Sequence, residues 1–72
     1  MMNKVVIFEP DSSGHKFIYV KRIINAATQK NIHCYLITTQ KNINHSIINE
    51  LKNNNNFYLY TISNSYFIYN NR

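Results

Sequence analysis

The sequence predicts a small α/β domain in which three parallel strands alternate with two helices. Apolar runs rich in strand-forming residues occur at 5–8, 32–39 and 57–62, and the segments between them carry apolar residues at helical spacing. Successive runs begin about 25–30 residues apart, which leaves room for a crossover helix and is too long for a hairpin. Right-handed crossovers then give the order β-α-β-α-β and a partial doubly wound, Rossmann-like sheet.

The first strand is predicted at residues 5–8, which form an unbroken run of Val, Val, Ile and Phe. A continuous rather than alternating apolar run is typical of a parallel strand that is buried on both faces. Pro10 cannot donate a ladder hydrogen bond and biases Glu9 away from helix, so the strand is expected to end here. The turn-forming residues 11–14 follow.

The first helix is predicted after this turn, because apolar residues recur at steps of three and four. Polar residues fall between them, so one stripe of the helix is expected to face the core. The predicted stripe consists of Phe17, Val20, Ile23, Ile24 and Ala27. Asn31 tolerates the left-handed conformation that closes a helix, and we expect the helix to end near it.

The second half of the sequence again predicts a strand followed by a helix, and this helix is shorter. Residues 32–39 favour a strand, residues 40–42 form a connector, and a helix is expected around Ile43 to Leu51 with Asn42 or Asn44 as its N-cap. The Asn run 53–56 ends this helix, and residues 57–62 form the third strand. The predicted domain therefore covers residues 1–62.

A short aromatic and Asn-rich tail follows at 63–72. Its run 66–69 has no crossover helix before it, and it is equally consistent with an extra strand and with a frayed tail. A three-strand parallel sheet leaves both edges open, and two helices cannot cover both of its faces well. A partner chain at the open sheet edge is therefore one expectation.

Composition narrows the functional classes. The 72 residues carry a formal net charge of +5, but the Lys and Arg residues are spread along the chain, so nucleic-acid binding is not favoured. One cysteine excludes an internal disulfide. The apolar runs are far shorter than the roughly 18 residues of a transmembrane helix and do not resemble a signal peptide, so a cytoplasmic location is expected.

The turn after the first strand is the most informative candidate site. In open parallel sheets, ligands bind beyond the carboxyl ends of the strands, where the N–H groups of a helix N-terminus favour phosphate or carboxylate. Ser12 and Ser13 supply hydroxyls, Gly14 lets the backbone approach a ligand, and Lys16 adds a positive charge. The alternative interpretation is structural: Asp11, Ser12 or Ser13 caps the helix and Gly14 only permits the turn. A single glycine excludes a dinucleotide fingerprint and a P-loop.

His15 is the candidate catalytic residue, because an imidazole at a helix N-terminus can act as a general base or donate to an oxyanion. A solvent-exposed loop histidine is the alternative. His33 and His45 lie at spacings that match no local metal-binding motif, and we expect neither a metal ion nor a cofactor. Cys34 lies in an apolar strand and is expected to pack as a small hydrophobic residue. The carboxylates of Glu9 and Asp11 are only weak evidence for general acid–base catalysis.

The segment from residue 4 to residue 62 resembles the start of the GT-B-fold glycosyltransferases, particularly their family 4-like group. Shared features are an apolar strand, the pair Glu9-Pro10, a loop with Gly14-His15, and a helix carrying Tyr19-Val20. Residues 31–39 are similar to the second strand of this family, except that Asn31 stands where glycine is usual.

This resemblance implies transfer of a sugar from a nucleotide-sugar donor to a sugar or lipid-linked acceptor. It further implies that Gly14 and His15 line the acceptor side of a cleft and approach the donor phosphates. The donor pocket of the family lies in a second domain that this sequence does not contain, so the expected molecule is an inactive fragment. The alternatives are a small stand-alone α/β binding module and a basic nucleic-acid-binding protein.

Overall fold

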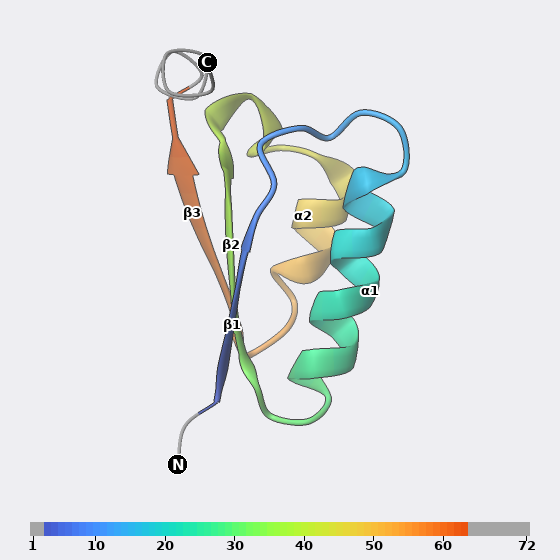
Figure 1. Cartoon of the computed structure of the whole chain (residues 1–72), viewed down its shortest axis with the longest axis vertical. Helices are drawn as coiled ribbons and strands as arrows, with labels where there is room; N and C mark the ends of the chain where they lie inside the picture. The colour runs from blue at the N-terminus through green and yellow to red at the C-terminus, as the bar shows by residue number, and fades with distance from the viewer. Residues whose placement is uncertain (1–2, 64–72) are drawn as a thin grey trace.

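The computed structural model describes residues 3–63, and the predicted three-strand parallel α/β fold is confirmed in them (Figure 1). The aromatic run 66–69 lies outside the described residues. Neither described helix has the length and apolar character needed to cross a bilayer. The elements in chain order are β1 (Lys4–Phe8), α1 (Lys16–Thr28), β2 (His33–Thr39), the 3-10 turn η1 (Gln40–Asn42), α2 (Ser46–Leu51) and β3 (Phe57–Ile62).

The strands lie in the order β1-β2-β3, and both neighbouring pairs are parallel. The register sets Ile7 beside Leu36, and Leu36 beside Leu59. Because side chains alternate across a strand, this row points to one face of the sheet and the adjacent row, which contains Val6 and Tyr35, points to the other.

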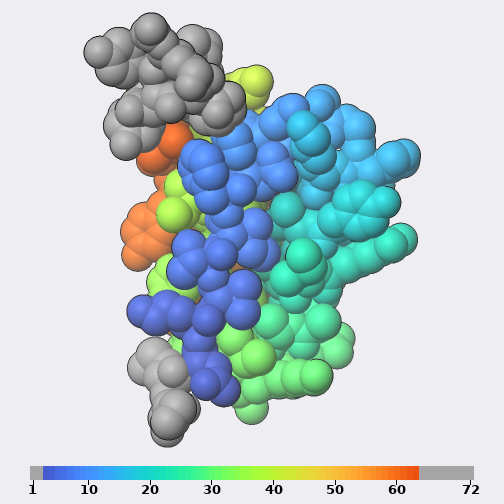
Figure 2. Space-filling view, in the orientation of Figure 1, coloured from blue at the N-terminus to red at the C-terminus, as the bar shows by residue number. Residues whose placement is uncertain are grey.

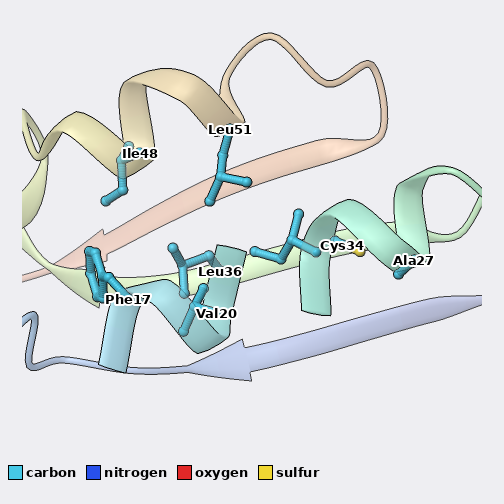
Figure 3. Packing of buried hydrophobic residues seen from close by; sticks show 8 residues of the cluster. Phe17, Val20, Ala27, Cys34, Leu36, Ile48 and Leu51 are labelled. Carbon is cyan, nitrogen blue, oxygen red and sulfur yellow. The ribbon is translucent and has the colours of Figure 1, made fainter. Parts of the chain in front are cut away.

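The core lies between the two helices and one face of the sheet (Figure 3). Side chains from α1 and α2 meet Cys34 and Leu36 of β2 in this layer. Ile23 was predicted on the buried stripe of α1, and this prediction is wrong: Ile23 is 51% exposed, whereas Ile24 is fully buried. Neighbouring residues on a helix point about 100° apart, so only one of the two isoleucines can face the sheet. The buried residues are Phe17, Val20, Ile24, Ala27, Cys34, Leu36, Ile48 and Leu51.

Both helices cover the same face of the sheet, and no described element covers the other (Figure 1). The predicted burial of β1 on both faces is therefore wrong, because Val6 is 57% and Phe8 55% exposed. The chain steps in one direction, from β1 to β2 to β3, and right-handed crossovers in one direction bring their helices to one side. Figure 2 views the molecule onto β1, which lies at the surface as an edge strand.

The helix ends show one confirmed prediction and one correction. Asn31 has a φ of 61°, and the N–H of Ile32 donates to the carbonyl of Ala27, so a left-handed residue closes α1 as expected. The N-cap of α2 is His45, whose Nδ1 accepts the N–H of Ile47 at 3.1 Å. Neither Asn42 nor Asn44 is that cap. The helix itself begins only at Ser46, because Ile43 belongs to the turn before it and is 41% exposed.

Candidate functional site

The connection between β1 and α1, residues 9–15, leaves the sheet at the carboxyl end of β1, where the sequence predicted a ligand site. The N–H of Glu9 still bonds to the carbonyl of Ile37 at 3.0 Å, so the chain departs from the sheet only after this residue. Gly14 has a φ of +62°, and a Cβ placed on it would meet no atom within 4 Å. The glycine is therefore required by its left-handed backbone and not by crowding.

The carboxylate of Asp11 is the centre of this connection. Its Oδ1 accepts the backbone N–H of Ser13 at 2.9 Å, and its Oδ2 accepts the Ser13 hydroxyl at 3.0 Å. The ammonium of Lys16 donates to the same Oδ2 at 2.7 Å. Two of the predicted phosphate-binding residues, Ser13 and Lys16, are thus brought together, and their donors converge on one anionic group.

The electrostatics of this cluster follow from these contacts. The hydrogen bond from Lys16, and then those from the backbone and hydroxyl of Ser13, hold the pKa of Asp11 well below its usual range. In turn, the carboxylate of Asp11 raises the pKa of Lys16. Both side chains are exposed, so the ion pair stabilises the fold only slightly.

The interpretation of this segment as a helix cap is wrong. The N-cap position of α1 is His15, and no side chain caps it. Asp11 instead bonds to the residue two positions ahead, a local turn that competes with helix capping. Ser12, which was also predicted to bind phosphate, is half-buried. The serine that bonds to Asp11 is Ser13.

His15 is next to Lys16 in the chain, but none of the residues that bond to Asp11 lines the hollow that contains His15. This hollow of about 330 Å³ lies on the outer side of α1 and is lined by His15, Ile18, Tyr19 and Arg22. The Arg22 guanidinium lies 5.9 Å from the centre of the Tyr19 ring. The imidazole is therefore accessible and has a cationic neighbour on the same helix, while Ser13 and Lys16 bond to Asp11 at the loop.

Three buried polar residues beneath the loop were missed by the sequence analysis. The hydroxyl of Thr39 donates to the carbonyl of Pro10 at 3.1 Å, and the amide of Asn42 donates to the same carbonyl at 3.0 Å. This amide also lies 3.0 Å from Oγ1 of Thr38 and 3.2 Å from Oγ1 of Thr39. The end of β2 and the turn η1 thereby hold the loop after β1 in place.

A signal for this network is visible in the sequence after the fact. Thr38 and Thr39 end an otherwise apolar strand, and Asn42 follows within one turn. Buried hydroxyls and amides need hydrogen-bond partners, so a polar cluster at the carboxyl edge of a sheet indicates a fixed loop above it. All three residues are almost completely buried. They hold the loop at Pro10 and are not exposed at its surface.

The remaining candidates have structural partners. Nδ1 of His33 lies 3.1 Å from the hydroxyl of Tyr58, and His45 caps α2 while its ring packs against Phe17 at 4.8 Å. Cys34 is fully buried, and this burial raises the pKa of its thiol. Within residues 3–63, no group of three or more His, Cys, Asp or Glu side chains could hold a metal ion.

Comparison of the chain with protein-family models, curated proteins and solved structures finds no match.

Proposed function

We propose that this chain is the N-terminal part of a glycosyltransferase domain of the GT-B type and has no transferase activity by itself. The observation that supports this proposal is the convergence of the Ser13 N–H, the Ser13 hydroxyl and the Lys16 ammonium at the carboxyl edge of a parallel sheet. The resemblance to the GT-B-fold glycosyltransferases implies that this edge faces a cleft and approaches the phosphates of a nucleotide-sugar donor.

The chemistry required of such a site is stabilisation of negative charge on the leaving diphosphate. Lys16 and the N-terminal end of the 13-residue helix α1 supply positive potential here. Gly14 gives close backbone access, and His15 is the accessible imidazole at the same helix end. A phosphate group would take the position that the Asp11 carboxylate now occupies among the same donors.

Asp11 therefore competes with the ligand in the isolated chain. The resemblance assigns the main donor pocket to a second domain, so we expect the loop alone to bind nucleotide-sugars more weakly than about 1 mM. Replacing Asp11 by Ala removes the competing carboxylate and frees the donors of Ser13 and Lys16.

Isothermal titration with UDP-glucose, GDP-mannose and ADP-glucose tests this proposal. We expect the unmodified chain to bind each of them more weakly than about 1 mM and Asp11→Ala to bind with a Kd below about 0.1 mM, at least tenfold tighter than that limit, or roughly 1.4 kcal/mol. The double variant Asp11→Ala/Lys16→Ala should lose this gain, because the ammonium is absent.

The matched control is Glu50→Ala. Glu50 forms a second exposed ion pair, with Lys21 at 2.7 Å, and its removal changes the net charge by the same amount. A gain in Glu50→Ala equal to that in Asp11→Ala would show only a general charge effect. An Asp11→Ala variant without any gain would contradict a phosphate site in this loop. Submillimolar binding by the unmodified chain would contradict the proposed dependence on a second domain.

A further inference from the structure

The cap of α2 contains an ionisable group that the proposed function does not use. His45 has an extended backbone, and its Nδ1 accepts the N–H of Ile47 at 3.1 Å. Its own N–H donates to the carbonyl of Asn42 at 3.0 Å, and its carbonyl accepts the N–H of Asn49 at 3.0 Å. The backbone of His45 is therefore fixed on both sides, and one ring nitrogen faces the first turn of the helix.

The hydrogen bond from Ile47 requires one charge state of the ring. A neutral imidazole has one nitrogen that accepts and one that donates, whereas both nitrogens of an imidazolium donate. Protonation of His45 would place the N–H of Nδ1 against the N–H of Ile47. It would also add a positive charge at the helix end where unpaired N–H groups already carry partial positive charge.

The ring has a second contact that limits its movement. It packs against the Phe17 ring with the two centroids 4.8 Å apart and the planes at 58°, and Phe17 is almost completely buried. A rotation of the imidazole away from Ile47 would break this aromatic contact with α1. Protonation of His45 therefore weakens either the cap of α2 or its packing on α1.

The charges around His45 do not compensate for an imidazolium. The ionisable groups on the elements that pack against it are Lys16, Tyr19, Lys21 and Arg22 of α1, Lys41 of η1 and Glu50 of α2. Glu50 is bound by Lys21 at 2.7 Å, and the carboxylate of Asp11 in the preceding loop is bound by Lys16. Within residues 3–63, no carboxylate forms an ion pair with His45.

The helix that His45 caps is unstable without such contacts. It has six residues, and an isolated helix of this length does not form in water. Ile48 and Leu51 point from α2 into the core between the helices and the sheet (Figure 3). Loss of the cap therefore favours an open state in which these two side chains become exposed.

From these observations we propose that α2 is an acid-sensitive element of the fold, which opens when His45 takes up a proton. Histidine is the side chain that ordinarily changes its charge between pH 5 and 8. The closed helix needs the neutral ring, and the open segment does not. The open state therefore binds the proton more readily, so the closed state is favoured at neutral pH and becomes less favourable as the pH falls toward 5.

Hydrogen exchange of the α2 amides at about pH 7.5 and about pH 5 tests this proposal. The N–H of Asn49 bonds to the carbonyl of His45 at 3.0 Å. The N–H of Lys52 bonds to the carbonyl of Ile48 at 3.0 Å, so the two amides report opening of the helix. After correction for the intrinsic exchange rate, we expect their protection to fall by about fivefold at the lower pH, the factor that a helix cap contributes.

Two histidine variants identify the group that is responsible. His45→Asn keeps a side-chain acceptor but cannot take up a proton, so it should show no fall in α2 protection between the two pH values. His15→Asn is the matched control, because His15 occupies the N-cap position of α1 and its side chain makes no cap hydrogen bond. This control should retain the fivefold fall in α2.

Other outcomes overturn the proposal. Equal protection of α2 at both pH values in the unmodified chain would show that the ring does not control the helix. A fall of the same size in His45→Asn would assign the pH dependence to another group, and its loss in His15→Asn would assign it to α1. Should His45→Asn fail to fold by circular dichroism, the unmodified chain still decides, because the amide shift of Ile47 must follow the titration of the His45 ring.

Discussion

Asp11 illustrates, at the scale of a single residue, how a carboxylate of the chain can accept the hydrogen bonds that the sequence predicted for a ligand. A sequence that supplies Ser13, Gly14 and Lys16 at the end of a strand predicts donors for a phosphate, and these donors do converge. The group on which they converge is a carboxylate two residues earlier. The carboxylate accepts these hydrogen bonds most strongly when it is ionised, so the interaction is expected to depend on pH.

The pH dependence follows from the direction of the pKa shift. The folded-state pKa of Asp11 is depressed below the unfolded value of about 3.9, so its stabilising effect is present above that value and is lost as pH falls through the folded pKa. In a carboxylate NMR titration, we expect Asp11 to ionise at a lower pH than an unperturbed aspartate. Lys16→Ala should raise the pKa of Asp11. An unchanged titration in Lys16→Ala would show that the ion pair is not maintained in solution.

At the scale of elements, α2 shows how a very short helix is maintained. It has only six residues, fewer than an isolated helix needs in water, so its stability comes from tertiary contacts and from its cap. Ile48 and Leu51 are buried in the core, and Nδ1 of His45 accepts the N–H of Ile47. The His45 ring also packs against Phe17 of α1.

His45→Ala is expected to destabilise the fold by about 1 kcal/mol, because it removes both the cap and the contact with Phe17. His45→Asn keeps a side-chain acceptor and should recover part of this loss. Urea unfolding of both variants measures the difference, and amide exchange of residues 46–51 localises it to α2. If His45→Asn were as destabilised as His45→Ala, the ring contact and not the cap would account for the effect.

At the scale of the whole molecule, one layer of helices on one face of a sheet forms a thin core. A chain of this length buries only about 60% of its unfolded surface, and its stability is correspondingly small. Eight hydrophobic residues are buried among those that the structure describes, six of them almost completely. Each of them therefore contributes a large share of the free energy of unfolding.

Two adjacent isoleucines on α1 test this dependence. Ile24→Ala should destabilise the protein by about 2–5 kcal/mol, because it leaves a cavity in the core. Ile23→Ala changes the same side chain at a position that is 51% exposed, and its effect should be within about 0.5 kcal/mol. Thermal unfolding of both variants measures the difference. Equal losses would contradict the orientation of α1 on the sheet.

Local patterns account for what the sequence determined by itself. The three strands, the long helix, the left-handed Asn31 and the parallel order all follow from periodicity, from turn-forming residues and from the distance between strands. These features depend on interactions within a few residues and on chain length. The cluster of donors after β1 is likewise local, because Ser13 and Lys16 lie within five residues of Asp11.

Only the tertiary structure decided which faces are covered. The direction and handedness of the two crossovers brought both helices to one face of the sheet. The apolar run at 5–8 had suggested burial on both faces, but Val6 lies on the uncovered face and is exposed. The tertiary structure also joined Pro10 to Thr39 and Asn42, across 29 and 32 residues. No local pattern encodes such pairs, because the partners of a buried polar group are chosen by the packing of elements that are distant in the chain.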